Sequence, residues 1–411
     1  MNTAANSIQS RKLKYYCDIT SSKRIYASDY VEDGIPFVRG KEVVQRYKNP
    51  GSLSSELFIT RNKFETLRDK FGAPIEGDLL LTSVGTLGVP YYVKPEDEFY
   101  FKDGNLIWFR QFQELRSKFL YYWIQSPRGR AQLQKCTIGT SQSAYTIERL
   151  KEIELDDFAL CKQERIASIL SAYDDLIENN RRRIALLEQA ARLLYKEWFV
   201  HLRFPGHEHT KIKNGVPEGW EKKKIANVCE TVGGGTPSTK VAEYWDGDVI
   251  WVVPSDVTKN DCLVLLDSER KITEKGLRAS SAKMVPAETI LMTSRASVGF
   301  FALMDKAVCT NQGFINVIPY ENDSRMYLLF HLMNRVDEIR GNAKGTTYPE
   351  ISKGRFREMD IVVPSKLLVE DFGKIVGDIV QQIRCLKRAT LQLTQARDLL
   401  LPRLMNGEVA V

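Results

Sequence analysis

The sequence repeats itself, and this feature constrains the fold more than any single motif. The segment Gly139–Leu155 (GTSQSAYTIERLKEIEL) aligns without gaps with Gly345–Ile361 (GTTYPEISKGRFREMDI). Further upstream, Leu79–Gly88 (LLLTSVGTLG) matches Ile290–Gly299 (ILMTSRASVG) at a slightly larger offset, which a difference in loop length explains. Self-similarity over long distances indicates a duplicated structural unit. The chain is therefore predicted to fold as two copies of the same order of elements.

Each copy has a mixed part and a helical part. The mixed part contains short apolar runs and Gly, Ser and Thr turns, as in Asp33–Val43 and its counterpart Asp246–Val257, which are typical of a turn followed by a strand. A long amphipathic segment follows in both copies, and the offset of the C-terminal alignment superposes Ile177 on Ile383. The predicted divisions are a mixed domain at 1–158, a helix at 159–205, a second mixed domain at 206–364 and a second helix at 365–411.

The helical segments carry apolar residues at heptad spacing. The predicted seam consists of Leu170, Tyr173, Ile177, Asn180, Ile184, Leu187 and Leu194 in the first helix and Val376, Ile379, Ile383, Leu386, Leu393 and Leu400 in the second. Pro402 is expected to end the second helix. Each helix could pack only on its own domain, but a helix of about 50 Å is longer than one small domain can cover. The predicted fold class is therefore α+β, with two tandem mixed α/β domains separated by a long antiparallel coiled coil in a pseudo-twofold repeat.

Composition limits the class of protein. Of 411 residues, 43% are hydrophobic and 27% are charged, which favours a folded globular chain, and the net charge of +7 slightly favours a polyanionic partner. No apolar run approaches the roughly 20 residues that span a bilayer, so a cytoplasmic location is expected. The cysteines are far apart and include no C-x-x-C pair, which predicts neither a zinc ribbon nor a disulfide framework. They are Cys17, Cys136, Cys161, Cys229, Cys262, Cys309 and Cys385.

The loop Val232–Lys240 (VGGGTPSTK) is the most conspicuous candidate site. Three consecutive glycines let backbone N–H groups approach a phosphate, and hydroxyl and ammonium groups can donate to phosphate oxygens. The loop lacks the G-x-x-x-x-G-K-[ST] pattern of a P-loop, and it could also be an ordinary glycine turn. The corresponding Ser21–Arg24 (SSKR) keeps donors and charge without glycines, which favours contact with nucleic acid over a nucleotide cradle.

A second loop, Thr293–Gly299 (TSRASVG), follows a predicted apolar strand. Its Arg295 could read guanine bidentately in the major groove, whereas Val84 stands at the matching position of the first copy. If these loops touch bases, the two copies recognise different sequences; the alternative is a pair of polar hairpin turns. The same argument applies to Gly139–Ser143 and Lys344–Tyr348.

The candidate DNA-contacting residues share small, hydroxyl-bearing or basic side chains in these loops. In the first copy they are Ser21, Ser22, Lys23, Arg24, Arg39, Lys41, Thr82, Ser83, Thr86, Thr140, Ser141, Gln142 and Ser143. In the second copy they are Gly233, Gly234, Gly235, Thr236, Ser238, Lys240, Ser255, Asp256, Thr293, Ser294, Arg295, Ser297, Thr346 and Thr347.

Catalytic and metal-binding signatures are missing from the sequence. His207 and His209 have no cysteine nearby, so a solvated linker is favoured over a metal site. No metal site is predicted in this chain. The G-x-S-x-G, H-E-x-x-H and G-x-G-x-x-G patterns are absent, as is an obvious nuclease cluster of carboxylates and lysine. A duplicated chain that is rich in turns but lacks catalytic and metal-binding motifs is predicted to be a recognition protein.

The motifs resemble those of one family. GGGTPS with YWDGDVIWVVPSDV, TSRASVG, Asn311–Pro319 (NQGFINVIP) and the loop-helix junction that ends each half are similar to the target recognition domains and helical regions of type I restriction-modification specificity subunits. The resemblance covers nearly the whole chain in the order recognition domain, helix, recognition domain, helix. The first copy departs from the pattern because it lacks the glycine-rich loop and the Tyr-Trp pair.

The resemblance implies a division of labour. Each recognition domain would bind one half of a split double-stranded DNA target, and the helices would space the two domains. Two methyltransferase subunits carrying S-adenosylmethionine would dock on the helices and methylate adenine, and restriction subunits would use ATP and Mg²⁺ to translocate and cleave. This chain would hold no cofactor. Two alternatives stay open: a methyltransferase or nuclease fusion, which would need a motif that is missing, and a coiled-coil scaffold that binds only protein.

Overall fold

The computed structural model describes residues 10–48, 55–139, 143–213, 215–345, 348–409 and 411. The chain divides into two compact units, each of which contains part of both long helices. Unit 1 comprises the residues up to Asn179 together with those from Leu391, and unit 2 runs from Asn180 to Thr390. The fold class is α+β, as the sequence predicts.

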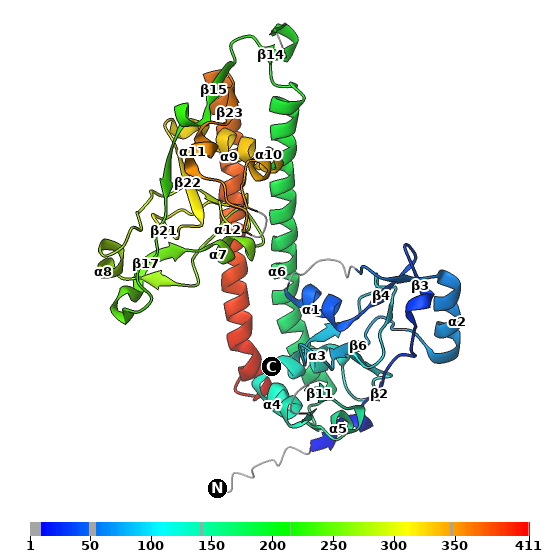
Figure 1. Ribbon diagram of the computed structural model, residues 1–411. Coiled ribbons are helices and arrows are strands. Elements are labelled where there is room, and N and C mark those ends of the chain that lie inside the picture. The colour runs from blue at the N-terminus through cyan, green and yellow to red at the C-terminus, as the bar shows by residue number, and fades with distance from the viewer. Residues whose placement is uncertain (1–9, 49–54, 140–142, 214, 346–347, 410) are drawn as a thin grey trace. The chain divides into compact units, whose positions relative to one another are not determined.

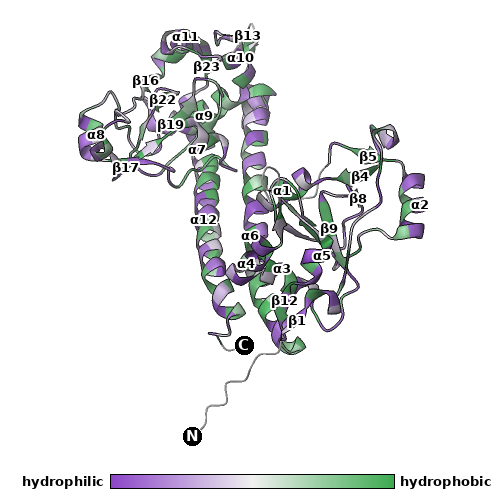
Figure 2. Cartoon of the chain, turned by 60° about the horizontal axis from the view of Figure 1, so that its bottom comes forward, coloured by the Kyte–Doolittle hydropathy of each residue, from purple (hydrophilic) through white to green (hydrophobic). Residues whose placement is uncertain are grey.

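The long helices are α6 (Leu160–Tyr195) and α12 (Lys366–Met405), the two longest in Figure 1. Their first residues lie next to the predicted starts at 159 and 365. A short π-helical turn, η3 (Lys196–Val200), continues α6. Hydrophobic and hydrophilic residues alternate along both helices in Figure 2. The expectation that Pro402 ends the second helix is wrong, since α12 continues to Met405. In the last turn a proline removes only one helical hydrogen bond, which the helix tolerates.

Within unit 1 the two helices are antiparallel. Leu170 near the start of α6 shares a hydrophobic cluster with Leu400 and Leu404 near the end of α12. Farther along α6, the carboxylate of Asp174 accepts a hydrogen bond from Arg397 at 2.5 Å. In unit 2 the end of α6 meets the beginning of α12, where the rings of Tyr195 and Phe372 lie 6.1 Å apart.

The predicted seam residues are all buried or half-buried, because each unit packs its own stretch of both helices against its mixed domain. Leu170, Ile177, Asn180, Ile184, Val376 and Ile383 are buried. Tyr173, Leu187, Leu194, Ile379, Leu386, Leu393 and Leu400 are half-buried.

The mixed part of unit 1 is built on two four-stranded sheets and two strand pairs. The first sheet is antiparallel in the order β2-β9-β6-β7 (Asp18–Thr20, Leu106–Arg110, Leu79–Thr82, Pro90–Tyr92). The second has the order β3-β5-β4-β8 (Tyr30–Val31, Phe58–Ile59, Ile35–Val38, Tyr100–Phe101), with β4 and β8 parallel. Strand β1 pairs with β12 (Ser10–Lys12, Glu154–Asp156), and β10 pairs with β11 (Thr137–Ile138, Ala144–Tyr145). The helices are α1, α2, α3, α4 and α5 (Gly40–Lys48, Arg61–Phe71, Ser117–Gln125, Pro127–Lys135, Ile147–Lys151).

Unit 2 repeats the topology of the first sheet. Its first sheet is β16-β22-β19-β20 (Cys229–Gly233, Phe314–Pro319, Ile290–Thr293, Phe301–Ala302). Its second is β18-β17-β21 (Lys271–Ile272, Trp245–Val252, Cys309–Thr310), with β17 and β21 parallel, and β15 pairs with β23 (Glu221–Lys224, Asp360–Val363). The helices are α7, α8, α9, α10 and α11 (Pro254–Thr258, Glu274–Arg278, Arg325–Asn334, Val336–Gly341, Lys353–Arg357). The predicted duplication is therefore confirmed in the strand order of the first sheet, whereas the second sheet has four strands in unit 1 and three in unit 2.

Candidate DNA interface

Several loops of unit 1 meet at one edge of its sheets. The backbone N–H of Ser83 donates to the carbonyl of Asn105 at 2.9 Å, and the N–H of Lys102 donates to Val38 at 2.9 Å. The hydroxyl of Ser22 donates to the Phe101 carbonyl at 2.6 Å. These bonds bring together segments 21–24, 39–41, 82–86, 101–106 and 143–145, which we call the loop edge of unit 1. Segments far apart in sequence thereby form one candidate surface.

Unit 2 builds the corresponding edge with corresponding bonds. The N–H of Ser294 donates to Gly313 at 2.7 Å, and that of Asn311 donates to Val252 at 3.1 Å. The N–H of Gly235 donates to Thr310 at 2.8 Å. Segments 233–240, 253–256, 293–297, 310–313, 344–345 and 348–351 form what we call the loop edge of unit 2. The two edges thus share a backbone framework and differ in their side chains.

Four predicted contact residues are structural instead. Thr82 and Thr293 are fully buried, and Ser83 and Ser294 nearly so. The Thr82 hydroxyl donates to the Thr86 carbonyl at 2.6 Å and accepts the Val89 N–H, and Thr293 makes the equivalent bonds to Ser297 and Phe300. The prediction that these buried side chains touch DNA is therefore wrong. Thr86 and Ser297, at the tips of the two turns, are exposed.

The glycine loop also differs from its prediction. A Cβ on Gly234 would collide with the carbonyls of Thr310 and Asn311, and one on Gly235 would collide with the Ser281–Ala282 backbone. The glycines Gly234 and Gly235 therefore allow close packing inside the unit, and the Gly235 N–H is already bonded and unavailable to a phosphate. A Cβ on the third, Gly233, would lie beside the Lys353 side chain.

Two tryptophans hold this loop in place. The indole N–H of Trp251 donates to the Gly235 carbonyl at 2.9 Å, and that of Trp245 donates to the Ser238 carbonyl at 3.1 Å. The Arg270 guanidinium covers the Trp245 ring at 3.8 Å. Trp245, the tryptophan of the Tyr-Trp pair, and Trp251 therefore hold the loop through its backbone carbonyls.

The exposed tip of this loop keeps donors that could face a ligand. Ser238 and Lys240 are exposed, and Thr236 donates to the side chain of Gln312 at 2.6 Å. Lys240, Lys344 and Lys353 are exposed and form no ion pair with any residue that the structure describes. These free ammonium groups are suited to phosphate oxygens.

In unit 1 the polar loop Ser21–Arg24 is tied to the sheet. Ser21 and Ser22 donate to the carbonyls of Leu106 and Phe101, so their hydroxyls serve the fold. Arg24 is exposed and pairs with Asp103 at 3.0 Å. The exposed Lys23 ammonium lies 5.1 Å from the centre of the Phe71 ring. Lys23 and Arg24 are the members of this segment that can reach a ligand.

The first residues of α1 and α7 use a carboxylate as a cap. Asp256 accepts the Val253 N–H at 2.8 Å and the Glu269 N–H at 3.2 Å, which leaves the predicted DNA contact of Asp256 without support. The half-buried Ser255 lies beside it. In unit 1 the equivalent cap is Glu42, which accepts the Arg39 N–H at 2.8 Å.

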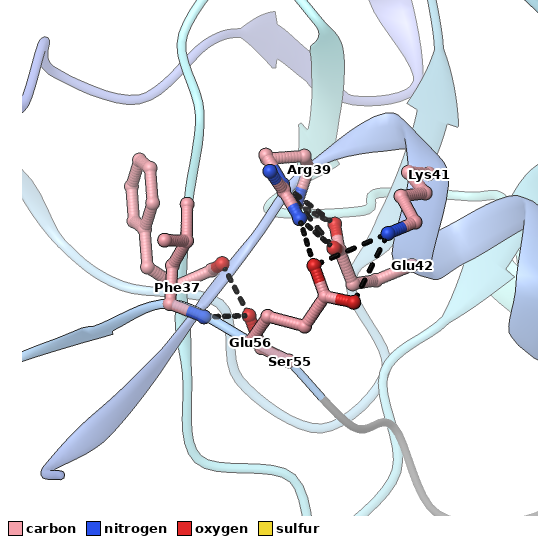
Figure 3. A network of polar contacts seen from close by, with 7 residues as sticks. Phe37, Arg39, Lys41, Glu42, Ser55 and Glu56 are labelled. Carbon is pink, nitrogen blue, oxygen red and sulfur yellow. Dashed lines mark hydrogen bonds and ion pairs between the residues drawn. The ribbon is translucent and has the colours of Figure 1, made fainter. Parts of the chain in front are cut away.

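Arg39 and Lys41 lie within a charged network at the loop edge of unit 1 (Figure 3). Arg39 bonds to the buried Glu42 through Nε and Nη2. The exposed Glu56 bridges the two cations, with Lys41 Nζ at 3.1 Å and Arg39 Nη2 at 3.4 Å. The hydrogen bond from Lys41 and its charge, with help from Arg39, hold the pKa of Glu56 below its ordinary value, so Glu56 stays ionised.

Arg295 lies at the loop edge of unit 2 and is paired as well. Its Nε and Nη2 donate to Glu350 Oε2 at 3.0 and 2.8 Å, and both side chains are about half exposed. Backbone bonds of Glu350 with Lys344, in both directions at 2.9 Å, hold the backbone that carries this carboxylate. In unit 1 the matching bridge joins Val84 and Ala144, neither of which carries a charge.

Some candidates lie outside the described residues, namely Thr140, Ser141, Gln142, Thr346 and Thr347. Ser143 is exposed beside them. Sequence reasoning missed Glu42, Glu56 and Glu350, the carboxylates that position the basic side chains. Of these, only Glu42 has a signal in the sequence, because a glutamate at the third position of a helix is typical of a helix-capping pattern.

A duplicated α+β chain with one polar loop edge per copy is the architecture of a tandem-domain binding protein. The family model described as the type I restriction modification DNA specificity domain matches it twice, at residues 7–189 and 217–387. The chain belongs to this family.

Two characterised relatives are similar to parts of the chain. The type I restriction enzyme MjaIX specificity subunit of Methanocaldococcus jannaschii is 38% identical over 187 residues, which cover 43% of this chain and 43% of that protein. The HindI specificity subunit of Haemophilus influenzae is 24% identical over 309 residues, covering 60% of this chain and 67% of that protein. The match thus spans less than half of the first relative.

The fold is also found in a solved structure. The S subunit of a type I restriction-modification system from M. genitalium superposes with a TM-score of 0.62 over 98% of both chains, at 18% identity. Helices long and apolar enough to cross a membrane are absent from the part of the chain that the structure describes.

Proposed function

We propose that this chain is the DNA sequence-specificity subunit of a type I restriction-modification complex and has no chemistry of its own. The observation that carries the proposal is the pair of loop edges built on one backbone framework with different side chains. Arg295 in unit 2 stands where unit 1 has Val84, and Arg39 in unit 1 stands where unit 2 has Val253. Because arginine reads guanine edges and valine does not, the two units would recognise different half-sites of a split double-stranded target.

The family supports assigning the reaction to partner subunits. Two methyltransferase subunits would bring S-adenosylmethionine, and restriction subunits would bring ATP, Mg²⁺ and translocation. A protein with this task would work in the cytoplasm, where its DNA lies.

Exposed leucines on the long helices are candidate docking points for the methyltransferases. Leu193 of α6 and Leu399 of α12 occupy equivalent positions of the repeat, and both are more than half exposed. Leu186 of α6 is exposed beside Leu193. Equivalent apolar positions in the two copies would give two similar sites for two copies of one partner.

Reconstitution with the methyltransferase subunits tests the proposal. DNA carrying random sequence is exposed to the complex, and the methylated adenines are mapped by sequencing. We expect one split motif, no methylation by either component alone, and an affinity that falls steeply with salt as counterions are released. Methylation by this chain alone would contradict the non-catalytic assignment, and an assembled complex without sequence preference would favour the scaffold alternative.

A further inference from the structure

In the network around Arg39, one nearly buried carboxylate, Glu42, holds the arginine through its backbone N–H, Nε and Nη2 (Figure 3). Glu42 is nearly fully buried, with 2% of its side chain exposed, whereas Arg39 keeps 27% of its side chain exposed. Glu42 accepts three kinds of N–H from the same residue: the backbone N–H, Nε and Nη2. A side chain fixed by its own helix cap in this way has little freedom to rotate.

Glu42 leaves one edge of the guanidinium free, and only a long contact of Nη2 with Glu56, at 3.4 Å, reaches it. Guanidinium has five N–H groups, and Glu42 takes Nε–H and one of the two on Nη2. What is left is Nη1, which has no bond to any described residue, and the second N–H of Nη2. These two nitrogens form the end-on fork that matches O6 and N7 of guanine.

An exposed carboxylate partly covers this fork. Glu56 is 72% exposed, and its Oε2 lies 3.4 Å from Nη2, a long contact, while its shorter bonds go to Lys41. Ser55, the residue before it, is anchored to the Phe37 carbonyl at 2.8 Å. Glu56 therefore lies where a polyanion approaching Lys41 and Arg39 would place its own oxygens.

We propose that Arg39 determines specificity in unit 1 by presenting its end-on fork to a guanine edge, that Glu42 is its positioning residue, and that Glu56 covers the fork in the free protein and is displaced by DNA. This inference rests on the proposed function. In unit 2, Val253 stands at the position equivalent to Arg39, and Asp256 at the position equivalent to Glu42. Because valine has no side-chain donor, unit 2 would recognise no base from this position. The guanine read by Arg39 therefore belongs to one half-site only.

The first experiment uses the complex with its methyltransferase subunits and a DNA library randomised in both half-sites. For R39A we expect discrimination at one base pair of one half-site to fall roughly 5- to 150-fold, with the other half-site unchanged. R61A is the control for the loss of an arginine elsewhere in unit 1, because Arg61, at the start of α2, forms a solvent-exposed pair with Glu98 at 2.9 Å. A uniform loss over both half-sites, or no change in base preference, would overturn the assignment of Arg39.

The second experiment separates positioning from folding. E42Q keeps the size of the side chain and removes its charge, so the same base pair should lose discrimination. The double variant R39A/E42Q should be no less selective than R39A, because Glu42 acts through Arg39. If E42Q lowered the melting temperature but kept the base preference, Glu42 would be a helix cap only, and its positioning role would be wrong.

The third experiment concerns Glu56. E56Q should bind the target several-fold more tightly with unchanged base preference, because DNA no longer displaces a carboxylate; E98Q is the control for charge. Weaker binding with a lost preference would mean that Glu56 accepts a hydrogen bond from a base, and the covering role would be wrong. Absence of sequence preference in the wild-type complex would overturn the proposed function itself, whereas a wild-type preference that R39A leaves intact would overturn only this inference.

Discussion

The guanidinium of Arg295 donates two hydrogen bonds to one oxygen of Glu350, a residue 55 positions away in the sequence. Glu350 is fixed by its backbone bonds to Lys344, and the N–H of the following Ile351 donates to Ser294 at 3.0 Å. The turn that carries Arg295 is thus tied to a second loop at the edge of unit 2.

The first prediction follows from this pair. R295A should weaken recognition of one half-site by about 1–3 kcal/mol, because a bidentate guanine contact is lost, and leave the other half-site intact. The measurement is binding to targets with single base-pair substitutions in each half. Changing the matched residue with V84A should not alter the preferred base in either half-site. Equal losses across all positions would mean that Arg295 contacts phosphate or holds the loop.

A second prediction concerns the glycine loop. G235A should destabilise unit 2 by about 1–3 kcal/mol, because the new methyl group collides with the Ser281–Ala282 backbone. G354A, in α11, introduces a methyl group with nothing within 4 Å and should leave stability unchanged or raise it by up to about 1 kcal/mol. Urea unfolding of both variants checks this. If G235A were as stable as wild type while losing DNA binding, the loop would be a phosphate cradle after all.

A third prediction concerns the helix pair in unit 1. The Asp174 carboxylate accepts hydrogen bonds from Tyr122 at 2.6 Å and from Arg397 at 2.5 Å, which joins α3, α6 and α12. D174N should cost about 1–3 kcal/mol, since a half-buried guanidinium loses one of its two charged partners and keeps only Asp398. D175N, at the exposed neighbouring position, is the matched control. Equal unfolding midpoints for the two variants would show that the contact adds nothing to stability.

The sequence predicted the fold well because duplication is visible in the residues themselves. One alignment covers both the loop at Gly139 and the helix after it, so it fixes the order of elements and the helix starts together. Burial at the loop edge could not be predicted in the same way. A threonine at the end of an apolar strand has the same sequence signal whether its hydroxyl faces solvent or, as at Thr82 and Thr293, closes its own turn.

The site was harder to predict because its decisive contacts join distant segments. Consecutive glycines serve close packing and phosphate binding equally well, and only the neighbours of Gly234 and Gly235 decide between them. The Arg39–Glu42 contact spans three residues and follows a helix-capping pattern, so it could have been found. Nothing near Arg295 in the sequence points to Glu350.

The last prediction concerns the buried His331 of unit 2. Its Nδ1 lies 3.1 Å from the Tyr195 hydroxyl of α6, and its Nε2 lies 3.2 Å from Nη1 of Arg335. Burial, with a further contribution from the Arg335 charge, lowers the pKa of His331 to about 3, so the imidazole is neutral in the folded protein.

The sign of the pH dependence follows from this lowered pKa. The unfolded chain protonates His331 near its ordinary pKa of about 6.5, whereas the folded chain does so only near 3. Between these values the unfolded state binds the extra proton, so stability is lost as the pH falls below about 6.5, by about 1.4 kcal/mol per pH unit. H331Q keeps a polar side chain that can bond to Tyr195 but cannot titrate in this range.

Chemical unfolding of wild type and H331Q from pH 7.5 to 5 provides the test. The difference between the two free energies of unfolding removes the contribution of the other titrating groups. Between pH 7.5 and pH 5 the free energy of unfolding of the wild type should fall by about 2 kcal/mol more than that of H331Q. H209Q, which removes an exposed imidazole, shows what loss of a solvated histidine does to the same curve. Parallel curves for wild type and H331Q would mean that His331 takes up its proton without unfolding the unit, and that the Tyr195–His331 contact does not need a neutral imidazole.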